Sequence, residues 1–183
     1  MEFINTDFNE LILIKPSIYS DDRGYFYEFF NESNAAFKPE KLNFVQDNIS
    51  RSTQGTLRGL HFQKYHPQGK LVTCLQGNVL DVVVDINIHS PTFGKHFSVE
   101  LSDSNNLMLW VPPSFAHGFY VLSKEAIFLY KCTDFYHQSD ESGIIWNDSQ
   151  LNIDWPSVTP TLSDKDSILP SFKDATSFLK DTL

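Results

Sequence analysis

Cysteine is scarce in this chain of 183 residues, which contains only Cys74 and Cys132. The two form no CxxC pair and are too few for a disulfide framework. We therefore expect two reduced, buried thiols in a cytoplasmic protein. Positive charge is scarce as well, because 14 Lys and Arg face 23 Asp and Glu and the formal net charge is -9. General binding to nucleic acid or to an anionic membrane needs a basic surface, so we expect neither partner.

Long hydrophobic runs are also missing. No apolar run approaches the roughly 20 residues needed to cross a bilayer, and the acidic residues Glu2, Asp7 and Glu10 argue against a secretory signal at the N-terminus. We find no internal repeat and no linker between domains. A length of 183 residues suits one hydrophobic core, so we expect a single domain over residues 1–183.

Aromatic residues are abundant instead, at 14% of the chain with 16 Phe. Phe and Tyr favour strands, so the composition favours β structure. Short strand-like segments follow one another with turns and no long helix between them, which predicts an antiparallel sandwich or barrel. The clearest pair is a hairpin of residues 70–75 and 79–85 around a turn at Gly77. The other predicted strands are residues 11–16, 25–30, 96–101, 106–111, 118–122 and 126–133.

Helix is predicted in only two short segments. Residues 31–42 are the first, with Asn31 or Ser33 as the N-terminal cap. The second runs from about residue 171 to residue 183. Both segments lie outside the run of predicted strands, so we expect the helices to be peripheral to the sheets.

The stretch Leu57-Arg58-Gly59-Leu60-His61-Phe62-Gln63 places a cation and a titratable imidazole in an otherwise apolar strand. Strict alternation sends Arg58 and His61 to opposite faces of that strand. A charge that points into a core is unfavourable unless it is paired. We therefore expect a bend or bulge near Gly59, so that both side chains reach one polar cavity.

Polar and titratable residues recur in other predicted strands. Each alone is more often structural, because a single strand His is usually satisfied in place and a single strand Lys usually faces solvent. Tyr130 alone would be a core residue with its hydroxyl at the rim. Together these residues favour a cavity lined by Glu28, Arg58, His61, Lys70, His117 and Tyr130.

The same residues do not assemble a metal or redox site. Residues 112–117 are similar to the second histidine motif of cupins, but the first motif is reduced to His61, followed by Phe62 and Gln63. A metal site needs three or four ligands at set geometry. No GxGxxG motif for a nicotinamide or flavin cofactor follows a strand. We expect a site without metal.

Ten short motifs carry a specific resemblance that covers most of the chain, from about Asp21 to Asp166. They are Asp22-Arg23-Gly24-Tyr25-Phe26 with Glu28, Gln46-Asp47-Asn48 with Ser50, Leu57-Arg58-Gly59-Leu60-His61-Phe62-Gln63, Gln68-Gly69-Lys70-Leu71-Val72, Asp81-Val82-Val83-Val84-Asp85, Ser90-Pro91-Thr92-Phe93-Gly94, Phe115-Ala116-His117-Gly118-Phe119, Tyr130-Lys131-Cys132-Thr133, Trp146-Asn147-Asp148 and Leu162-Ser163-Asp164-Lys165-Asp166. The chain resembles the deoxythymidine-diphosphate (dTDP)-4-dehydrorhamnose 3,5-epimerase family, a metal-free cupin family. It departs from many members at Asn87 and Ile49, which are not catalytic positions.

The resemblance implies an all-β fold, an antiparallel jelly-roll or cupin β-sandwich with a few short peripheral helices. It also implies that dTDP-4-dehydro-6-deoxy-D-glucose becomes dTDP-4-dehydro-L-rhamnose, in dTDP-L-rhamnose biosynthesis. The two carbons that flank the ketone are inverted by removing a proton and returning one to the opposite face, which requires no cofactor. The family is homodimeric and exchanges strands between protomers, so a homodimer is expected.

Four residues match the catalytic parts of the family. His61 matches the general base, because an imidazole titrates near the working pH. Asp166 matches the carboxylate that orients this imidazole and stabilises its protonated form. Tyr130 matches the acid on the far face. Lys70 matches the cation near the keto oxygen, where negative charge develops.

Further residues match family contacts to the sugar, the diphosphate or the nucleoside. Arg suits a diphosphate because its planar fork makes paired, charge-assisted hydrogen bonds, and Tyr136 matches an aromatic that stacks on the thymine. Glu141 and Lys165 could instead be surface charges, and Asp47 could be a turn residue. The predicted binding residues are Arg23, Glu28, Gln46, Asp47, Asn48, Arg58, Lys70, His117, Tyr136, Glu141 and Lys165.

Three other functions stay open. A sister enzyme that epimerises only one carbon, C3 or C5, of a related nucleotide-linked 4-keto-6-deoxysugar would share all of these residues. A non-catalytic module would bind the sugar nucleotide without proton exchange. A metal-dependent cupin oxygenase would contain stoichiometric iron or manganese.

Overall fold

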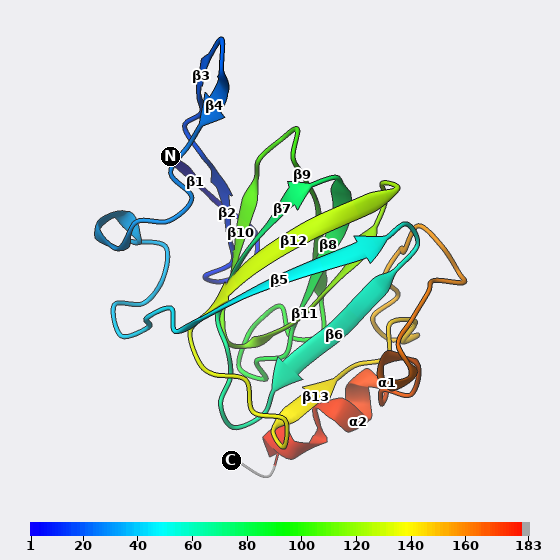
Figure 1. Ribbon diagram of the computed structural model, residues 1–183. Helices are drawn as coiled ribbons and strands as arrows, with labels where there is room; N and C mark the ends of the chain where they lie inside the picture. The colour runs from blue at the N-terminus through cyan, green and yellow to red at the C-terminus, as the bar shows by residue number, and fades with distance from the viewer. Residues whose placement is uncertain (181–183) are drawn as a thin grey trace.

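Two antiparallel sheets lie face to face in the computed structural model, which describes residues 1–180 (Figure 1). The first sheet contains, in spatial order, β1 (Glu2–Asn5), β2 (Ile12–Lys15), β10 (Met108–Val111), β7 (Lys70–Gln76), β12 (Glu125–Cys132) and β5 (Gln46–Thr53). The second contains β13 (Glu141–Gly143), β6 (Leu57–Gln63), β11 (Phe115–Val121), β8 (Asn78–Asp85) and β9 (His96–Ser102). The predicted antiparallel β-sandwich is confirmed.

Smaller elements surround this sandwich. A ribbon of β3 (Tyr19–Asp21) and β4 (Gly24–Phe26) projects from the body (Figure 1). The short helices are α1 (Asp164–Ser167) and α2 (Phe172–Ala175), and the 3-10 turns are η1 (Glu32–Asn34) and η2 (Ser177–Lys180). The prediction of a few short peripheral helices is confirmed. Among residues 1–180, none of the helices has the length and apolar character to cross a membrane.

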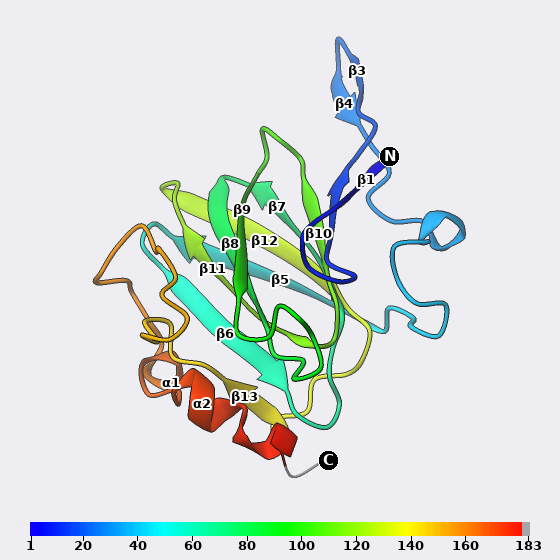
Figure 2. The same cartoon turned by 180° about the vertical axis from the view of Figure 1, so that it is seen from behind.

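The core consists of apolar layers between and outside the sheets. Val72 of β7, Val83 of β8 and Phe128 of β12 belong to one buried cluster, which both sheets supply. Val82 and Val84 point the other way, into a cluster between the second sheet and the C-terminal segment. The helices of that segment lie beside β6 and β13 (Figure 2). Because β8 is buried on both faces, its sequence is apolar without alternation.

The predicted hairpin of β7 and β8 is wrong. The two strands belong to different sheets, and the turn at Gly77 carries the chain from one sheet to the other. The turn is held by side chains from distant loops, since the Gly77 N–H donates to Asp103 Oδ2 at 2.8 Å and the Asn78 N–H donates to Ser123 Oγ at 2.8 Å. The local sequence of a tight turn is the same whether the two flanking strands pair with each other or enter different sheets. Contacts with residues distant in the sequence therefore decide between these two arrangements.

Two predictions in the N-terminal part are corrected. The helix predicted at residues 31–42 is reduced to η1, which Asn31 caps by accepting the Ser33 N–H at 3.0 Å. The strand predicted at residues 25–30 is shortened to β4. The aromatic side chains of this region pack on the outer face of the first sheet around the buried Trp110, and this tertiary packing overrides local propensity. They are Phe29, Phe30, Phe37 and Phe44.

The C-terminal helix predicted from residue 171 to residue 183 is confirmed only in part. Ser171 caps α2 by accepting the Asp174 N–H at 3.2 Å, but α2 has four residues and η2 follows it. Phe172 and Ala175 are buried against the second sheet, which fixes α2 there. The end of the prediction, residues 181–183, lies outside the described part of the chain.

Candidate active site

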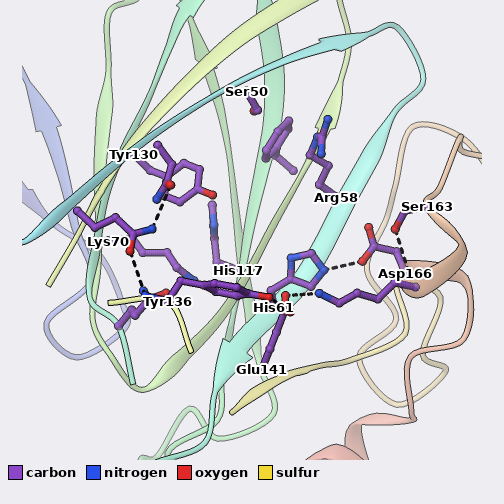
Figure 3. Close-up of a pocket in the computed structure, with 15 residues that line it drawn as sticks. Ser50, Arg58, His61, Lys70, His117, Tyr130, Tyr136, Glu141, Ser163 and Asp166 are labelled. Carbon is purple, nitrogen blue, oxygen red and sulfur yellow. Dashed lines mark hydrogen bonds and ion pairs between the residues drawn. The ribbon is translucent and has the colours of Figure 1, made fainter. Parts of the chain in front are cut away.

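A cavity of about 410 Å³ opens between the two sheets. Strands β5, β7 and β12 of the first sheet and β6 and β11 of the second contribute to its wall, together with the region of α1 (Figure 3). The structure brings most of the predicted site residues together there. These are Gln46, Asn48, Arg58, His61, Lys70, His117, Tyr130, Tyr136, Glu141, Lys165 and Asp166.

Arg58 and His61 both point into this cavity, which confirms the bulge expected from their conflict with alternation (Figure 3). His117 of β11 pairs with His61, and Phe119 pairs with Arg58, so three steps along β6 oppose two along β11. The extra residue of β6 brings the two polar side chains to the same face.

Gly59 is the residue that makes this bulge possible. Its φ of +115° lies in a region that side chains rarely adopt. A Cβ at this position would lie 2.6 Å from Gly118 Cα and 2.7 Å from His117 O. Leu57 and Leu60 pack in the outer cluster on the opposite face of β6.

His61 Nε2 lies 2.5 Å from Asp166 Oδ1. Asp166 is 4% exposed and lies in the first turn of α1, where its N–H donates to Ser163 Oγ at 3.1 Å. Burial acts to raise the pKa of Asp166, but the hydrogen bond and charge of His61 hold the pKa below its usual value. Because a carboxylate only accepts, Nε2 of His61 carries a proton and Nδ1 of the neutral ring keeps a lone pair. This imidazole can therefore accept a proton at Nδ1.

Tyr130 and Lys70 come from the first sheet, opposite His61. Burial raises the pKa of the Tyr130 phenol, which therefore keeps its proton at neutral pH and can donate it. Lys70 is 8% exposed, and its burial lowers the pKa of the ammonium, while the charges of Asp81 and Glu141 act in the opposite direction. The cavity thus holds a protonated phenol and a buried amine facing the imidazole.

A second imidazole–carboxylate pair lies in the wall of the cavity. His117 Nε2 is 2.8 Å from Oδ2 of Asp81, which is fully buried. Oδ1 of Asp81 has no hydrogen-bond partner within the described residues. The sequence interpretation assigned no role to Asp81, although a charged residue in the apolar run of β8 was a signal that could have identified it. Asp81 fixes the orientation in which His117 faces the cavity.

Tyr136, Glu141 and Lys165 form one network at the edge of the cavity. The Tyr136 hydroxyl donates to Glu141 Oε2 at 2.6 Å, and Glu141 Oε1 forms an ion pair with Lys165 Nζ. Burial acts to raise the pKa of Glu141, but Lys165 and Tyr136 hold it below its usual value. Glu141 and Lys165 are therefore not isolated surface charges.

Side chains alternate between the two faces of β5, so the strand brings some of the predicted site residues to the cavity and turns one of them away. Gln46, Asn48 and Ser50 all line the cavity. Asp47 lies between them on the other face, where its carboxylate is 2.7 Å from Lys131 Nζ. The predicted placement of Asp47 at the site is corrected, and it is a strand residue, not a turn residue. The same alternation could have identified Ser50, to which no role was assigned.

Arg23 and Glu28 do not line the cavity of their own chain, where Glu28 had been expected, so their contact with the substrate stays a prediction. Arg23 lies at the tip of the projecting ribbon, where its Nη2 is 2.6 Å from Asp21 Oδ2 (Figure 1). Glu28 accepts a hydrogen bond from Asn31 Nδ2 at 2.9 Å. Arg23 and Glu28 could contact a bound ligand only if a second chain brought its own cavity to them.

The cavity offers a base and an acid on opposite walls. His61 Nδ1 can accept a proton from a bound molecule on one side, and the Tyr130 phenol can deliver a proton from the other. Lys70 is available where negative charge develops. Within residues 1–180, no three His, Cys, Asp or Glu side chains form a cluster that could hold a metal ion. The geometry suits proton transfer at a carbon acid.

Comparison with known proteins gives consistent relatives. The family model described as dTDP-4-dehydrorhamnose 3,5-epimerase matches residues 5–174. A protein of that description from Shigella flexneri is 48% identical over 183 residues, which cover 98% of this chain and 100% of that protein. A crystal structure of the epimerase from Elizabethkingia anophelis has 47% identity and a TM-score of 0.89, covering 96% of this chain and 98% of that one. The epimerase from Legionella pneumophila, solved in complex with dTDP-4-keto-L-rhamnose, has 50% identity and a TM-score of 0.88, covering 93% and 92%.

Proposed function

The chain belongs to the dTDP-4-dehydrorhamnose 3,5-epimerase family, and from this premise we propose that it converts dTDP-4-dehydro-6-deoxy-D-glucose into dTDP-4-dehydro-L-rhamnose. It is an epimerase of dTDP-L-rhamnose biosynthesis, in a family that requires no cofactor. One observation carries the proposal for the site: the His61–Asp166 pair lies across a single cavity from Tyr130.

His61 begins the reaction as the general base. Its Nδ1 takes the proton from a sugar carbon next to the C4 ketone, and the electron pair of the broken C–H bond forms an enolate with its charge on the C4 oxygen. Asp166 keeps the imidazole oriented and stabilises the imidazolium. A positioned base of this kind typically contributes about 10²–10⁴-fold in rate.

Lys70 stabilises the enolate oxygen. In a buried site the attraction between an ammonium and a developing oxyanion is stronger than in water. Burial lowers the pKa of Lys70, and the arrival of an anionic oxygen favours the charged form again. The stabilisation is therefore greatest when the oxygen carries charge, as differential binding of a transition state requires.

Tyr130 completes the inversion. Its phenol gives a proton to the face of the enolate carbon opposite His61, so that the carbon regains its C–H bond with inverted configuration. The phenolate and the imidazolium then restore their protonation by exchange with solvent. The same two groups act in turn on C3 and C5, the carbons on either side of the ketone.

The remaining cavity residues bind the sugar nucleotide. Arg58 pairs with the diphosphate, for which its planar fork is suited, and Tyr136 stacks on the thymine. The ligand of the Legionella relative supports a dTDP-linked keto-sugar as the substrate. Gln46, Asn48, His117, Glu141 and Lys165 complete the contacts to the sugar and the nucleoside.

The assembly we propose is a homodimer that exchanges N-terminal strands, so that Arg23 and Glu28 serve the partner's cavity. Both residues lie outside the cavity of their own chain. β1 is an edge strand, whose unpaired N–H and C=O groups favour pairing with another chain. The N-terminal region also exposes several large apolar side chains, which would suit contact with a second protomer. The exposed side chains are Phe3, Ile4, Ile18, Tyr19, Tyr25 and Phe26.

The proposed enzyme is a single cupin-like domain of residues 1–183 that works in the cytoplasm. Cys74 and Cys132 are both free and buried, which fits a reducing compartment. The net charge of -9 gives no support to partners other than the small substrate and the second protomer.

Proton exchange tests the proposal directly. The protein is incubated with dTDP-4-keto-6-deoxyglucose in heavy water, and C3 and C5 are followed by NMR. We expect deuterium at both carbons and the appearance of dTDP-4-dehydro-L-rhamnose. Exchange at one carbon alone would identify a monoepimerase, and binding without exchange would identify a non-catalytic module. Stoichiometric iron or manganese in the purified protein would point to an oxygenase.

A further inference from the structure

Gln63 lies on β6, two residues beyond His61, and is 5% exposed. Its amide bonds only to backbone groups in the described part of the chain. Nε2 donates to His66 O at 2.7 Å and to Phe135 O at 3.1 Å. Oε1 accepts the His137 N–H at 2.7 Å. A buried amide with this set of partners connects segments that are far apart in the sequence.

The connected segments are the two loops that border the cavity. The first, residues 64–69, leads from β6 to Lys70 at the start of β7. The second, residues 133–140, leads from β12 to Glu141 at the start of β13. Gln63 therefore ties the strand of the general base to both loops that deliver cavity residues.

Tyr136 lies at the centre of the second loop. Phe135 and His137 are its neighbours in the chain, so Gln63 holds the backbone immediately before and after it. The N–H of Tyr136 itself donates to Gln46 Oε1 at 3.0 Å. The Tyr136 side chain is 50% exposed. Packing alone therefore does not fix this ring, and its position depends on the hydrogen bond of its hydroxyl to Glu141 and on the backbone that carries it.

The loops have backbone–backbone bonds near their ends, from Lys64 N–H to Asp140 O at 3.2 Å and from Thr133 N–H to Gly69 O at 2.9 Å. Between these points, side chains connect them. The Asp140 carboxylate assists Gln63 there by accepting the His66 N–H at 2.7 Å. The segment that carries Tyr136 thus depends on buried polar side chains more than on a strand ladder.

We propose that Gln63 is a positioning residue for nucleotide recognition, which holds residues 135–137 so that Tyr136 is ready to stack on the thymine base. The inference rests on the proposed function, which assigns the thymine to Tyr136. His61 and Tyr130 lie on β6 and β12, outside these two loops. Loss of the Gln63 amide therefore weakens nucleotide binding and leaves the removal of a proton from the bound substrate by His61 nearly unchanged.

The test compares wild-type protein with Gln63→Met, which has a side chain of similar length without the amide. Calorimetry with dTDP measures affinity, and hydrogen exchange measures protection of the His137 N–H. We expect Kd for dTDP to rise about 5- to 50-fold and the His137 N–H to lose protection. The proton-exchange rate at saturating substrate stays close to that of wild type, while KM rises with Kd.

Gln63→Glu provides a second variant that keeps the chain length and one acceptor. Its carboxylate can still accept the His137 N–H, but it faces the oxygens of His66 and Phe135 without a donor. Lowering the pH protonates the carboxyl and restores one donor. We expect its affinity for dTDP to improve, relative to wild type at the same pH, as the pH falls. Recovery would show that the loop needs a donor to His66 O or Phe135 O at this position.

Tyr136→Ala distinguishes positioning from general destabilisation. If Gln63 acts through Tyr136, Gln63→Met changes the Kd for dTDP little in the Tyr136→Ala background. Asn105→Leu is the matched control, because Asn105 likewise bonds backbone groups on both sides of a turn, between β9 and β10, and does not line the cavity. We expect it to leave the affinity for dTDP unchanged. The backbone partners of Asn105 are Glu100 O, Ser102 N and Leu107 N.

Two results would overturn the inference: an unchanged Kd in Gln63→Met although the His137 N–H has lost protection, or full additivity of Gln63→Met with Tyr136→Ala. Failure of the proposed function gives a different result. In that case wild-type protein binds dTDP and shows no proton exchange with the keto-sugar, while the comparison of Kd values still decides the role of Gln63. Absence of dTDP binding by wild-type protein would overturn both.

Discussion

His61 and His117 face each other as a cross-strand pair on β6 and β11, and each imidazole bonds its own buried aspartate. His61 bonds Asp166 of α1, and His117 bonds Asp81 of β8. The side chain of His61 is 31% exposed and that of His117 only 8%. The more open pair can exchange protons with a ligand and with solvent, whereas the buried pair suits a fixed contact.

Asp166→Asn should reduce turnover about 10²–10⁴-fold. An amide in place of the carboxylate no longer requires the proton on Nε2 of His61 and does not stabilise the imidazolium. The Kd for dTDP, measured by calorimetry, should stay near that of wild type, because Asp166 acts on the sugar end. His61→Ala is the matched comparison and should lose a similar factor. Turnover at the wild-type rate in Asp166→Asn would remove the dyad from the mechanism.

Tyr130→Phe should abolish inversion while leaving deprotonation. The partly buried phenol, whose raised pKa keeps it protonated, is the proton source for the second face. Without it, His61 can still remove a proton and return a deuteron to the same face. NMR in heavy water should therefore show deuterium in recovered substrate without the epimerised product, and nearly intact dTDP binding. Full double epimerisation by this variant would show that the acid is another group.

Gly59→Ala should destabilise the fold more than Gly24→Ala. Both glycines have positive φ, +115° and +132°, and this backbone strain is worth about 1–3 kcal/mol in each. At Gly24 a Cβ meets no atom within 4 Å, whereas at Gly59 it would lie 2.6 Å from Gly118 Cα, adding overpacking of about 1–3 kcal/mol. Chemical denaturation measures both. Equal losses of unfolding free energy would mean that the bulge has room for a side chain.

Acid should destabilise the protein in part through Asp140. Burial acts to raise the pKa of Asp140, but the N–H groups of Tyr65 and His66 hold the pKa below its usual value. A carboxyl with a lowered folded pKa adds stability above its unfolded pKa of about 3.9, and this stability is lost as the pH falls through the folded pKa. Thermal unfolding as a function of pH should show a smaller acid-induced loss for Asp140→Asn than for wild type. The exposed Asp7→Asn should behave as wild type.

The exchanged dimer can be tested with two inactive variants. If Arg23 serves the partner's cavity, mixing unfolded Arg23→Ala and His61→Ala chains and refolding them together should create dimers with one intact site. Random pairing would restore about a quarter of the wild-type sites. Epimerase assays of the mixture and of each variant alone measure this recovery. A mixture no more active than its components would place Arg23 in its own chain's site or outside any site.

Residue types and short motifs were enough to predict much of the site. The conflict between Arg58 and His61 predicted a bulge at Gly59, and the motifs named Asp166, Tyr130 and Lys70 although they are far apart in the sequence. The first inference succeeds because a buried charge needs a partner or a ligand wherever the strand lies, whereas the second rests on the family resemblance. Alternation within β5 would also have excluded Asp47 and included Ser50, since a strand's period is a local property.

The sequence by itself therefore determined the β-rich class, the alternating faces and the chemical character of the cavity. Only the tertiary structure decided that β7 and β8 separate at Gly77, that Asp81 lies behind His117, and that Gln63 holds the loop of Tyr136. Each of these depends on groups distant in the chain, whose meeting is set by the packing of two sheets. Local propensity contains no information about such partners, because the free energy that selects them arises from burial of the whole core.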